Sequence, residues 1–541
     1  MSECRITRRE FVTLGSAGLA GLALAACASV ATGPSGVAAP TTAAVAAVKR
    51  GGVVHTVMGT GLPTLNPILS TWLHGFFEMI YDPLLRAEIV DPEARTYEIK
   101  PGLAESWEWN DDNTAVTFNL REGVTFHDGS AWDAEVAHWN LDMIFNHPQS
   151  LPKNLFEGLI KDFEVVGPMQ VRITLNAPSA TLLLNLSNSS GRVYFISKAH
   201  FEAVGEEAFG ADPSGTGPFQ FDSWIKEDQV TLKRFDGYWE NGEDGQPLPY
   251  LDGLEYRLIP ETATQVVELR SGNLDFINIA EASIVSSLQA DSSINVVENP
   301  ISGAFYICVG LNQSVGIFGE NPLVRQAALH ALNREAMLKT FGFGLGTLTP
   351  YPYWREGMIG YNDTLPFYEY DLEKAKTLLE QAGFPDGVDV TLTVIQRPLE
   401  QQQAEVIKQL WDSAGIRTTL EVLERTAWIA KMQEGSADAG FWRYTNPVDT
   451  DQMSRAVVTG SVGNWGNYSN PKVDDLMAQA RQLLDADQRQ TLYEEAQRVI
   501  YEDACLLTCY FQADFYGVQK YVQGLVFDTN QERLHTVWLN K

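Results

Sequence analysis

Residues 116–129 read Val-Thr-Phe-Asn-Leu-Arg-Glu-Gly-Val-Thr-Phe-His-Asp-Gly. Apolar and polar side chains alternate up to Gly123, which breaks the run before Val124 and Phe126 resume it. A period of two places every second side chain on one face, so this stretch predicts a half-buried β-strand followed by a turn at its Asp-Gly end. The same alternation recurs in residues 171–175, 230–232, 254–258 and 390–394.

Other segments carry the spacing of amphipathic helices. Residues 372–382 follow Asp371, a suitable N-cap, and Gly383 ends their pattern. Further helices are predicted at residues 324–338, 403–414 and 487–503. Because strands and helices are mixed along the whole chain, the predicted fold class is α/β, with sheets covered by helices.

Length and charge narrow the class of protein further. The chain has 541 residues, and 69 acidic against 39 basic side chains give a formal net charge of −30. At roughly 150 residues per domain, this length predicts about three structural units. A hydrophobic fraction of 45% excludes an intrinsically disordered chain. The negative charge repels phosphate backbones, so we expect no nucleic-acid partner.

The first 26 residues have the composition of a signal peptide. Arg5, Arg8 and Arg9 precede an uncharged stretch rich in Leu, Ala and Gly, residues 11–26. As a helix this stretch would be about 24 Å long, which is short of the ~30 Å hydrocarbon core of a bilayer. It therefore predicts an export signal and not a membrane span.

Two motifs in this segment resemble known export signals. Thr7-Arg8-Arg9-Glu10-Phe11-Val12 resembles the twin-arginine motif, which makes the twin-arginine export machinery an expected partner. Leu24-Ala25-Ala26-Cys27 resembles a lipobox with Cys27 as the lipidated residue; the alternative is an ordinary small residue at a cleavage site. With a flexible tether over residues 27–50, we expect a protein that is exported and lipid-anchored at the outer face of the cytoplasmic membrane.

Motifs for catalysis and metal binding are missing from the sequence. It contains no HExxH, GxSxG or GxxxxGKS/T, and its eight His residues are scattered. We therefore expect no enzymatic activity, no catalytic residue, no metal and no cofactor. Cys308, Cys505 and Cys509 are too few for a disulfide framework, and an extended chain between the last two exceeds the ~7 Å bridging limit. Buried free thiols are expected.

Aromatic residues gather in one turn-prone segment, Gly-Phe-Trp-Arg-Tyr-Thr-Asn-Pro at residues 440–447. Trp465 and Tyr468 follow in a second segment rich in Gly and Asn. Aromatic faces for stacking and a guanidinium for a carboxylate favour a ligand-binding wall. The alternative is that these aromatic residues pack as core beneath a long loop.

The opening stretch, together with Gly102-Leu103-Ala104-Glu105-Ser106-Trp107, resembles the signature of the family 5 extracellular solute-binding proteins. These are the dipeptide-, oligopeptide- and nickel-type receptors of ABC importers. The resemblance continues in residues 80–84, 215–219, 251–253, 321–327, 374–384 and 468–474. It covers nearly all of residues 50–541.

The resemblance implies a two-lobed periplasmic-binding-protein type II (cluster C) fold with an extra inserted domain. Lobe I would comprise residues 51–72, 186–297 and 508–541, the inserted domain residues 73–185, and lobe II residues 298–507. Crossovers near 297–303 and 506–511 would form a hinge. The implied partners of this monomer are a peptide or small-molecule ligand and the ABC permease subunits in the membrane. An exported hydrolase or a sensor on the same scaffold is the alternative of another class.

The sequence departs from peptide-binding members at one point. In those members Gly-Trp is followed shortly by an Asp, which pairs with the peptide's ammonium group. Here no acid stands before Asn446, although Asp449 and Asp451 follow and could replace it. An ammonium group buried without its carboxylate is costly, so the ligand class should differ, and we expect Arg443 to bind a ligand carboxylate.

The complete set of expected ligand-binding residues is Tyr81, Trp428, Phe441, Trp442, Arg443, Tyr444, Asn446 and Trp465. Trp442, Tyr444 and Trp465 are expected to stack on or enclose the body of the ligand. A nickel–chelator complex is disfavoured, because no His lies between His330 and His535. An opine or a sugar stays open as a ligand.

Overall fold

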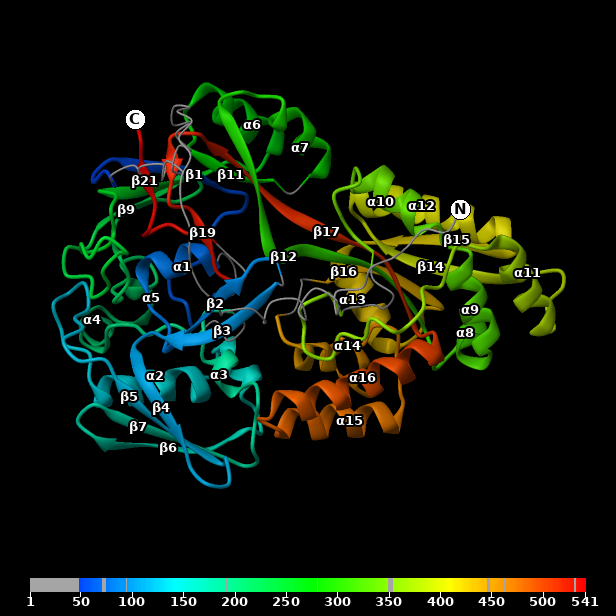
Figure 1. Ribbon diagram of the computed structural model, residues 1–541, viewed down its shortest axis with the longest axis horizontal. Coiled ribbons are helices and arrows are strands. Elements are labelled where there is room, and N and C mark those ends of the chain that lie inside the picture. Colours follow the sequence, from blue (N-terminus) through cyan, green and yellow to red (C-terminus); the bar gives the residue numbers. More distant parts are fainter. Residues whose placement is uncertain are drawn as a thin grey trace, which may run out of the picture. The chain divides into compact units, whose positions relative to one another are not determined.

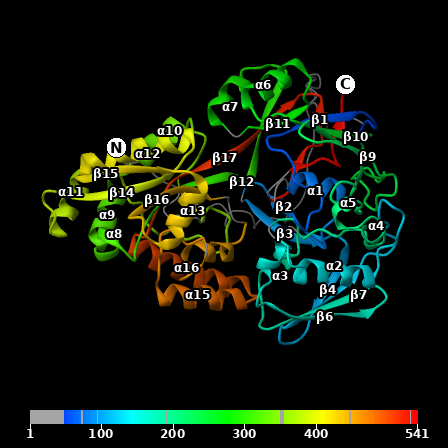
Figure 2. The same ribbon diagram turned by 180° about the vertical axis from the view of Figure 1, so that it is seen from behind.

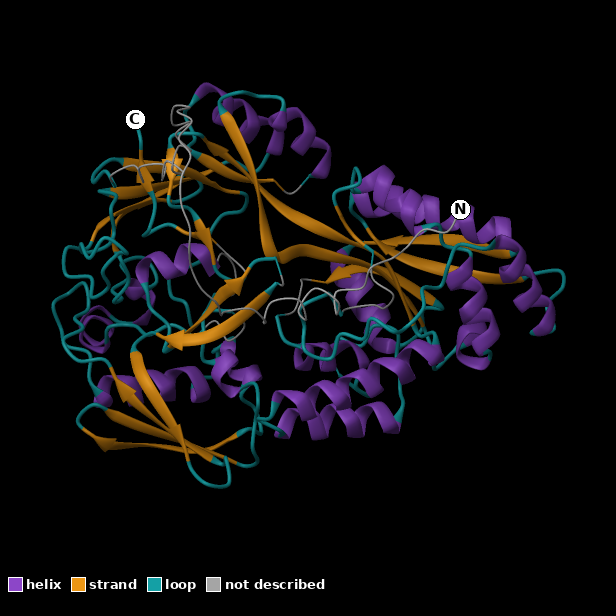
Figure 3. Cartoon of the chain, in the orientation of Figure 1, coloured by secondary structure: helices purple, strands orange, loops and turns teal. Residues whose placement is uncertain are grey.

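The computed structural model describes residues 48–541 except 71–73, 94, 190–192, 280, 349–353, 445–447, 462 and 530–531. The side chains of residues 74, 300–306 and 507 are not described either. The described chain forms three sheets of four or more strands, covered by helices (Figures 1 and 3). None of its helices is both long and apolar enough to cross a membrane. The predicted signal segment and Cys27 lie outside the described residues.

The first sheet has four strands in the order β1-β10-β9-β8. They are β1 (Val53–Met58), β8 (Phe219–Ile225), β9 (Gln229–Arg234) and β10 (Gly253–Leu258). Only β1 and β10 pair in parallel. Val230 and Leu232 are buried at alternate positions of β9, as their period of two predicts. They share a core with α1 (His74–Ile80), α4 (Lys198–Val204) and α5 (Glu206–Phe209).

The second sheet has seven strands in the order β11-β17-β12-β16-β14-β15, with β13 paired to β17. They are β11 (Phe276–Ile279), β12 (Ile294–Leu311), β13 (Gly346–Thr347), β14 (Val388–Ile395), β15 (Ile416–Leu423), β16 (Ala439–Tyr444) and β17 (Leu506–Gln519). β12 and β17, here called the long strand pair, run antiparallel from Ile294 opposite Gln519 to Gly310 opposite Leu506. Their register shifts between Asn299 and Phe305, beside the predicted crossover of residues 297–303.

Helices cover both faces of the second sheet. One face carries α9 (Pro322–His330), α10 (Arg334–Phe341), α11 (Leu372–Gln381) and α12 (Pro398–Ala414). The other carries α13 (Arg425–Glu434), α14 (Ser454–Val457), α15 (Pro471–Gln482) and α16 (Ala486–Asp503). α6 (Thr262–Ser271) and α7 (Ala282–Gln289) pack against β11, and α8 (Gly316–Glu320) precedes α9. Figure 2 shows the same covering from behind.

One predicted helix is wrong in extent. Residues 324–338 form parts of two helices, α9 and α10, and not one. The chain breaks between them because Asn333 caps α10, where its side chain accepts a hydrogen bond from the N–H of Ala336 at 2.9 Å. The other three predicted helices are present, and Asp371 caps α11 as expected.

The third sheet has the order β4-β5-β7-β6 and contains residues 116–120, the first part of the stretch 116–129, whereas residues 121–129 lie outside the sheet. Its strands are β4 (Ala104–Trp109), β5 (Ala115–Leu120), β6 (Ile160–Gly167) and β7 (Gln170–Leu175). α2 (Ala134–Asn146) covers it, followed by a 3-10 helix, η2 (Pro152–Leu155). β2 (Leu85–Asp91) and β3 (Thr96–Pro101) form a separate hairpin, the β2–β3 hairpin, and α3 (Leu182–Asn185) lies later in the chain.

Near the C-terminus, four short strands form two further pairs. They are β18 (Val522–Gln523) with β21 (Trp538–Leu539), and β19 (Val526–Phe527) with β20 (Glu532–Arg533). Cys308, Cys505 and Cys509 are buried free thiols, as predicted. Cys505 lies between the end of α16 and the start of β17, and Cys509 lies in β17, so the chain between them is extended, as expected.

Candidate functional site

Residues 440–447 carry the aromatic side chains that were predicted to bind a ligand, and the first part of this segment is a β-strand. Residues 439–444 form β16, which lies between β12 and β14. Phe441, Trp442 and Tyr444 are all buried. A strand covered by helices on both faces is apolar at successive positions and shows no alternation, so its sequence does not display the period of two. The expectation of a turn-prone loop at residues 440–444 is therefore wrong.

The strand separates the predicted residues between its two faces. Successive side chains of a strand point to opposite sides. Trp442 and Tyr444 pack with α13–α16, whereas Phe441 packs in the core beneath α9–α12. Arg443 lies on the side of Phe441, where it meets Glu400 of α12. The structure thus does not place Arg443 on the same side of the sheet as Trp442 and Tyr444.

Four predicted residues form one aromatic cluster, Trp428, Trp442, Tyr444 and Trp465. The ring of Trp428 lies 6.1 Å from that of Trp442 and 5.6 Å from that of Trp465, and Trp442 lies 5.6 Å from Tyr444. The indole N–H of Trp428 donates to the carbonyl of Thr393 at 3.3 Å. Only Trp465 is partly exposed, so the cluster is core for the most part and Trp465 is its accessible edge.

Arg443 belongs to a cluster of two guanidinium groups and one carboxylate, here called the arginine pair. Arg443 Nε lies 3.0 Å from Glu400 Oε1, and Arg397 Nη1 donates to the same oxygen at 3.4 Å. The Glu400 side chain is 4% exposed, against 27% for Arg443 and 41% for Arg397. Burial lowers the pKa of Arg443; Glu400 opposes this shift and Arg397 adds to it. The cluster therefore carries one positive charge in excess.

The two candidate replacements for an ammonium-binding acid are already paired. Asp449 accepts hydrogen bonds from Arg489 Nη2 at 2.8 and 3.0 Å. Asp451 accepts from Arg481 Nε at 2.9 and 3.1 Å, and burial raises the pKa of its carboxyl group although Arg481 acts in the opposite direction. Asp449 also caps the 3-10 helix η3 (Thr450–Met453). Both carboxylates thus hold protein partners.

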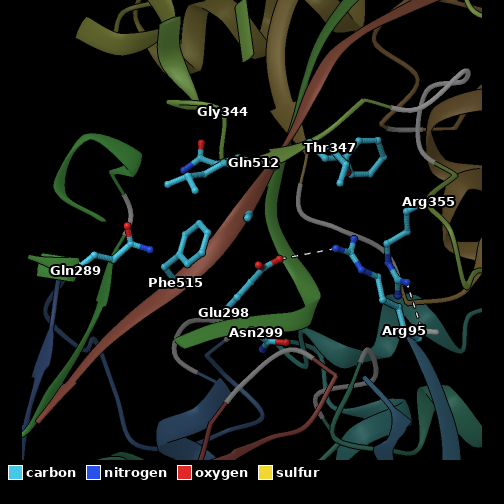
Figure 4. Close-up of a pocket in the computed structure, with 13 residues that line it drawn as sticks. Arg95, Gln289, Glu298, Asn299, Gly344, Thr347, Arg355, Gln512 and Phe515 are labelled. Atoms are coloured by element: carbon cyan, nitrogen blue, oxygen red, sulfur yellow. Dashed lines mark hydrogen bonds and ion pairs between the residues drawn. The ribbon is translucent and has the colours of Figure 1, made fainter. Parts of the chain in front are cut away.

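A cavity of about 380 Å³ lies against the long strand pair (Figure 4). This volume is within the roughly 300–1,000 Å³ of small-molecule sites. Its charged lining is Arg95 from the β2–β3 turn, Glu298 from β12 and Arg355. Its apolar lining includes Phe511 and Phe515 of β17. The cavity therefore offers both charges and aromatic surface to a solute.

The sheet register connects this cavity with β16. Tyr444 pairs with Tyr306, Tyr306 with Phe511, and Phe511 with Thr347. Phe511 and Thr347 line the cavity, and Phe511 also belongs to the core that holds the aromatic cluster. At about 4.8 Å per strand, the backbone of Tyr444 lies about 10 Å from that of Phe511. The neighbouring row holds Arg443, Ile307 and Tyr510.

Two predicted residues stand apart from these groups. Tyr81 is fully buried in the core of the first sheet, where its hydroxyl donates to the carbonyl of Leu65 at 2.7 Å. Burial raises the pKa of this hydroxyl well above its usual range. Asn446 lies outside the described residues.

The residues that line the cavity were missed from the sequence. Arg355 directly follows Trp354, which is the same aromatic–Arg signal that identified Trp442 and Arg443. Glu298 lies within the predicted crossover, whereas Arg95 carries no signal of its own. Among the described residues no group of three or more His, Cys, Asp and Glu side chains could hold a metal ion.

The family model described as bacterial extracellular solute-binding proteins, family 5 Middle, matches residues 98–487, well over half of the chain. The dipeptide-binding protein of Escherichia coli K12 is 28% identical over 475 residues, which cover 81% of this chain and 86% of that protein. The glutathione-binding protein GsiB of Salmonella paratyphi A is 30% identical over 420 residues, which cover 75% and 79%.

Among solved structures, the periplasmic binding protein DppA of Helicobacter pylori, in complex with the peptide STSA, matches with a TM-score of 0.74. It is 27% identical, and the match covers 91% of this chain and 99% of that one. The mixed α/β fold of the cluster C periplasmic binding proteins, predicted from the sequence, is thereby confirmed.

Proposed function

The chain belongs to family 5 of the bacterial extracellular solute-binding proteins. We propose that it recognises its solute through an anionic group that the solute carries. Its function is that of a substrate-binding protein of an ABC importer for peptides or related solutes, and it is not an enzyme. The relatives' names speak of dipeptides and glutathione, both of which carry carboxylates. The ligand proposed here is an organic solute of this kind, with at least one carboxylate.

The observation that carries this proposal is the excess positive charge of the arginine pair. Arg397 and Arg443 both contact Glu400, so two guanidinium groups lie beside one carboxylate, and their combined positive charge favours the approach of a second anion. Arg443 is largely buried, and partial burial strengthens a charge-assisted hydrogen bond. The register row of Tyr444 leads to the cavity through Phe511, whereas Arg443 lies in the neighbouring row with its side chain on the other side of the sheet.

The paired state of Asp449 and Asp451 supports the same ligand class. Each would have to leave an arginine before it could bind a ligand ammonium group. Asp449 and Arg489 form a buried pair, and removing one partner from such a pair leaves an uncompensated charge, at a cost of roughly 3–5 kcal/mol; Arg481 is 44% exposed, so this cost does not extend to Asp451. Recognition of a carboxylate by the arginine pair needs no such exchange.

Affinity measurements on matched variants test the proposal. Native mass spectrometry of the purified protein identifies the solute that copurifies, and titration calorimetry then compares wild type, Arg443→Ala and Arg397→Ala. A lost charge-assisted hydrogen bond is worth roughly 1.5–3 kcal/mol, so each variant should bind about 10- to 100-fold more weakly. Arg172→Ala removes an exposed arginine of β7 and serves as the control. Unchanged affinity in both test variants contradicts the proposal.

The proposal also covers the location of the protein in the cell. The twin-arginine and lipobox motifs support export by the twin-arginine machinery and lipid attachment at Cys27. The family is extracellular, which agrees with both. A protein tethered at the outer face of the membrane would meet the permease subunits without leaving that surface.

A further inference from the structure

The cavity joins three parts of the chain that lie far apart in the sequence. Arg95 belongs to the turn of the β2–β3 hairpin, Glu298 to the long strand pair, and Arg355 to the segment between β13 and α11. Arg95 Nη2 lies 3.7 Å from Glu298 Oε1, and Arg355 Nη1 donates to the backbone carbonyl of Arg95 at 3.2 Å. Figure 4 shows the Arg95 and Glu298 side chains pointing toward one another, with Arg355 beside Arg95. One residue of the hairpin thus contacts both other parts.

The backbone of Arg95 is not suited to an arginine. Its φ is +57°, in the left-handed region that glycine adopts without penalty. The hairpin turn by itself would therefore be better served by Gly or Asn. Because a side chain at such a position costs energy in the fold, it is retained for what it contacts.

The contact with Glu298 does little for the stability of the fold. The side chains are 29% and 45% exposed, and exposed pairs contribute only a small part of the stability of a protein. The pair does, however, join the hairpin to the strand pair at the place where the register of β12 and β17 shifts. A weak contact between two elements can change the population of two arrangements without changing whether the protein is folded.

We infer that Arg95 is a positioning residue for solute capture, which holds the β2–β3 hairpin against β12 and Arg355 so that the cavity keeps its three charged walls. Arg95 acts through Glu298 and Arg355, and the inference requires no contact between Arg95 and the solute. The inference rests on the proposed function only because it assumes that the cavity takes part in binding the solute. The position of the hairpin itself can be measured without any solute.

The experiment uses hydrogen–deuterium exchange of the full chain at low salt, without added solute. Arg95→Gly relieves the backbone strain and removes the guanidinium, so the melting temperature should stay the same or rise. Amides of residues 85–101 and 294–299 should nevertheless exchange at least threefold faster. Arg95→Lys keeps the charge and should hold exchange near the wild-type rate. In wild type, 0.5 M NaCl should screen the pair and move exchange toward that of Arg95→Gly.

Asn113→Gly is the matched control. Asn113 has the same φ of +57°, in the turn between β4 and β5, and no contact with the long strand pair is described for it. It should leave exchange at residues 294–299 unchanged. The inference is overturned if Arg95→Gly exchanges like wild type, if Asn113→Gly has the same effect, or if Arg95→Lys fails to restore slow exchange. Because no solute is present, these outcomes are independent of whether the arginine pair binds a carboxylate.

Discussion

At the scale of single residues, two motifs of the family resemblance meet at His127. Its Nε2 donates to the carbonyl of Gly217 at 2.9 Å, and its Nδ1 accepts from the N–H of Gly215 at 3.3 Å. A Cβ atom on either glycine would lie within 3 Å of Ile80, so only glycine fits there. The motifs at residues 126–129 and 215–219 therefore hold the chain together around this ring.

This geometry predicts how stability depends on pH. Burial lowers the pKa of His127 to about 4, against 6.5 in the unfolded chain, and a proton on Nδ1 would oppose the N–H of Gly215. The unfolded state therefore binds more protons between pH 6.5 and 4, and stability should fall as the pH drops through this window. In His127→Gln the slope should decrease by up to about 1.4 kcal/mol per pH unit, measured by urea unfolding.

The control for this measurement is Asn119→Ala, which changes a side chain of β5 that does not titrate. Its slope between pH 6.5 and 4 should match wild type. If His127→Gln keeps the wild-type slope as well, His127 does not titrate as its contacts indicate.

At the scale of elements, the sequence predicts a strand well when apolar and polar side chains alternate along it. β5, β7 and β9 alternate buried and exposed residues and are found where the period of two places them. β16 is buried on both faces, so its aromatic run resembles a loop motif. Arg443 and Trp442 are adjacent in sequence but lie on opposite sides of the sheet, which no pattern at residues 440–447 reveals.

A glycine of β12 tests how the aromatic cluster is seated. A Cβ atom on Gly310 would lie 2.1 Å from the ring of Trp442, so this ring lies directly over the glycine. Gly310→Ala should push the Trp442 ring away and destabilise the protein by about 1–3 kcal/mol, the cost of overpacking a core. Urea unfolding gives the stability, and near-UV circular dichroism reports the changed Trp environment.

Gly59→Ala provides the comparison, because a Cβ atom there has no neighbour within 4 Å. It should leave both signals unchanged. A Gly310→Ala protein with wild-type stability and an unchanged near-UV spectrum would mean that Trp442 does not occupy this position.

At the scale of the whole molecule, the cavity could not be predicted, because it depends on chain segments brought together by the fold. Arg95 and Glu298 come from the β2–β3 hairpin and from β12, and Arg355 from a third segment. Local periodicity relates residues that are a few positions apart, so it carries no information on contacts between segments that are far apart in the sequence. The resemblance supplies the fold class. The crossover that it implies near residues 297–303 stays a prediction, and the register of β12 and β17 shifts in the same stretch.

The proposed attachment of the whole molecule to the membrane depends on one atom, the sulfur of Cys27. Two acyl chains anchor a protein stably, because each buried CH₂ contributes about 0.8 kcal/mol, whereas a single chain binds only reversibly. Cys27→Ser should therefore move the protein from the membrane fraction to the soluble fraction outside the cytoplasm, measured by cell fractionation and immunoblotting. Cys4→Ser, which changes the other cysteine of the N-terminal segment, should leave the protein with the membrane. If Cys27→Ser stays membrane-bound after a high-salt wash, the anchor is not at Cys27, and the uncharged stretch of residues 11–26 would have to hold the protein instead.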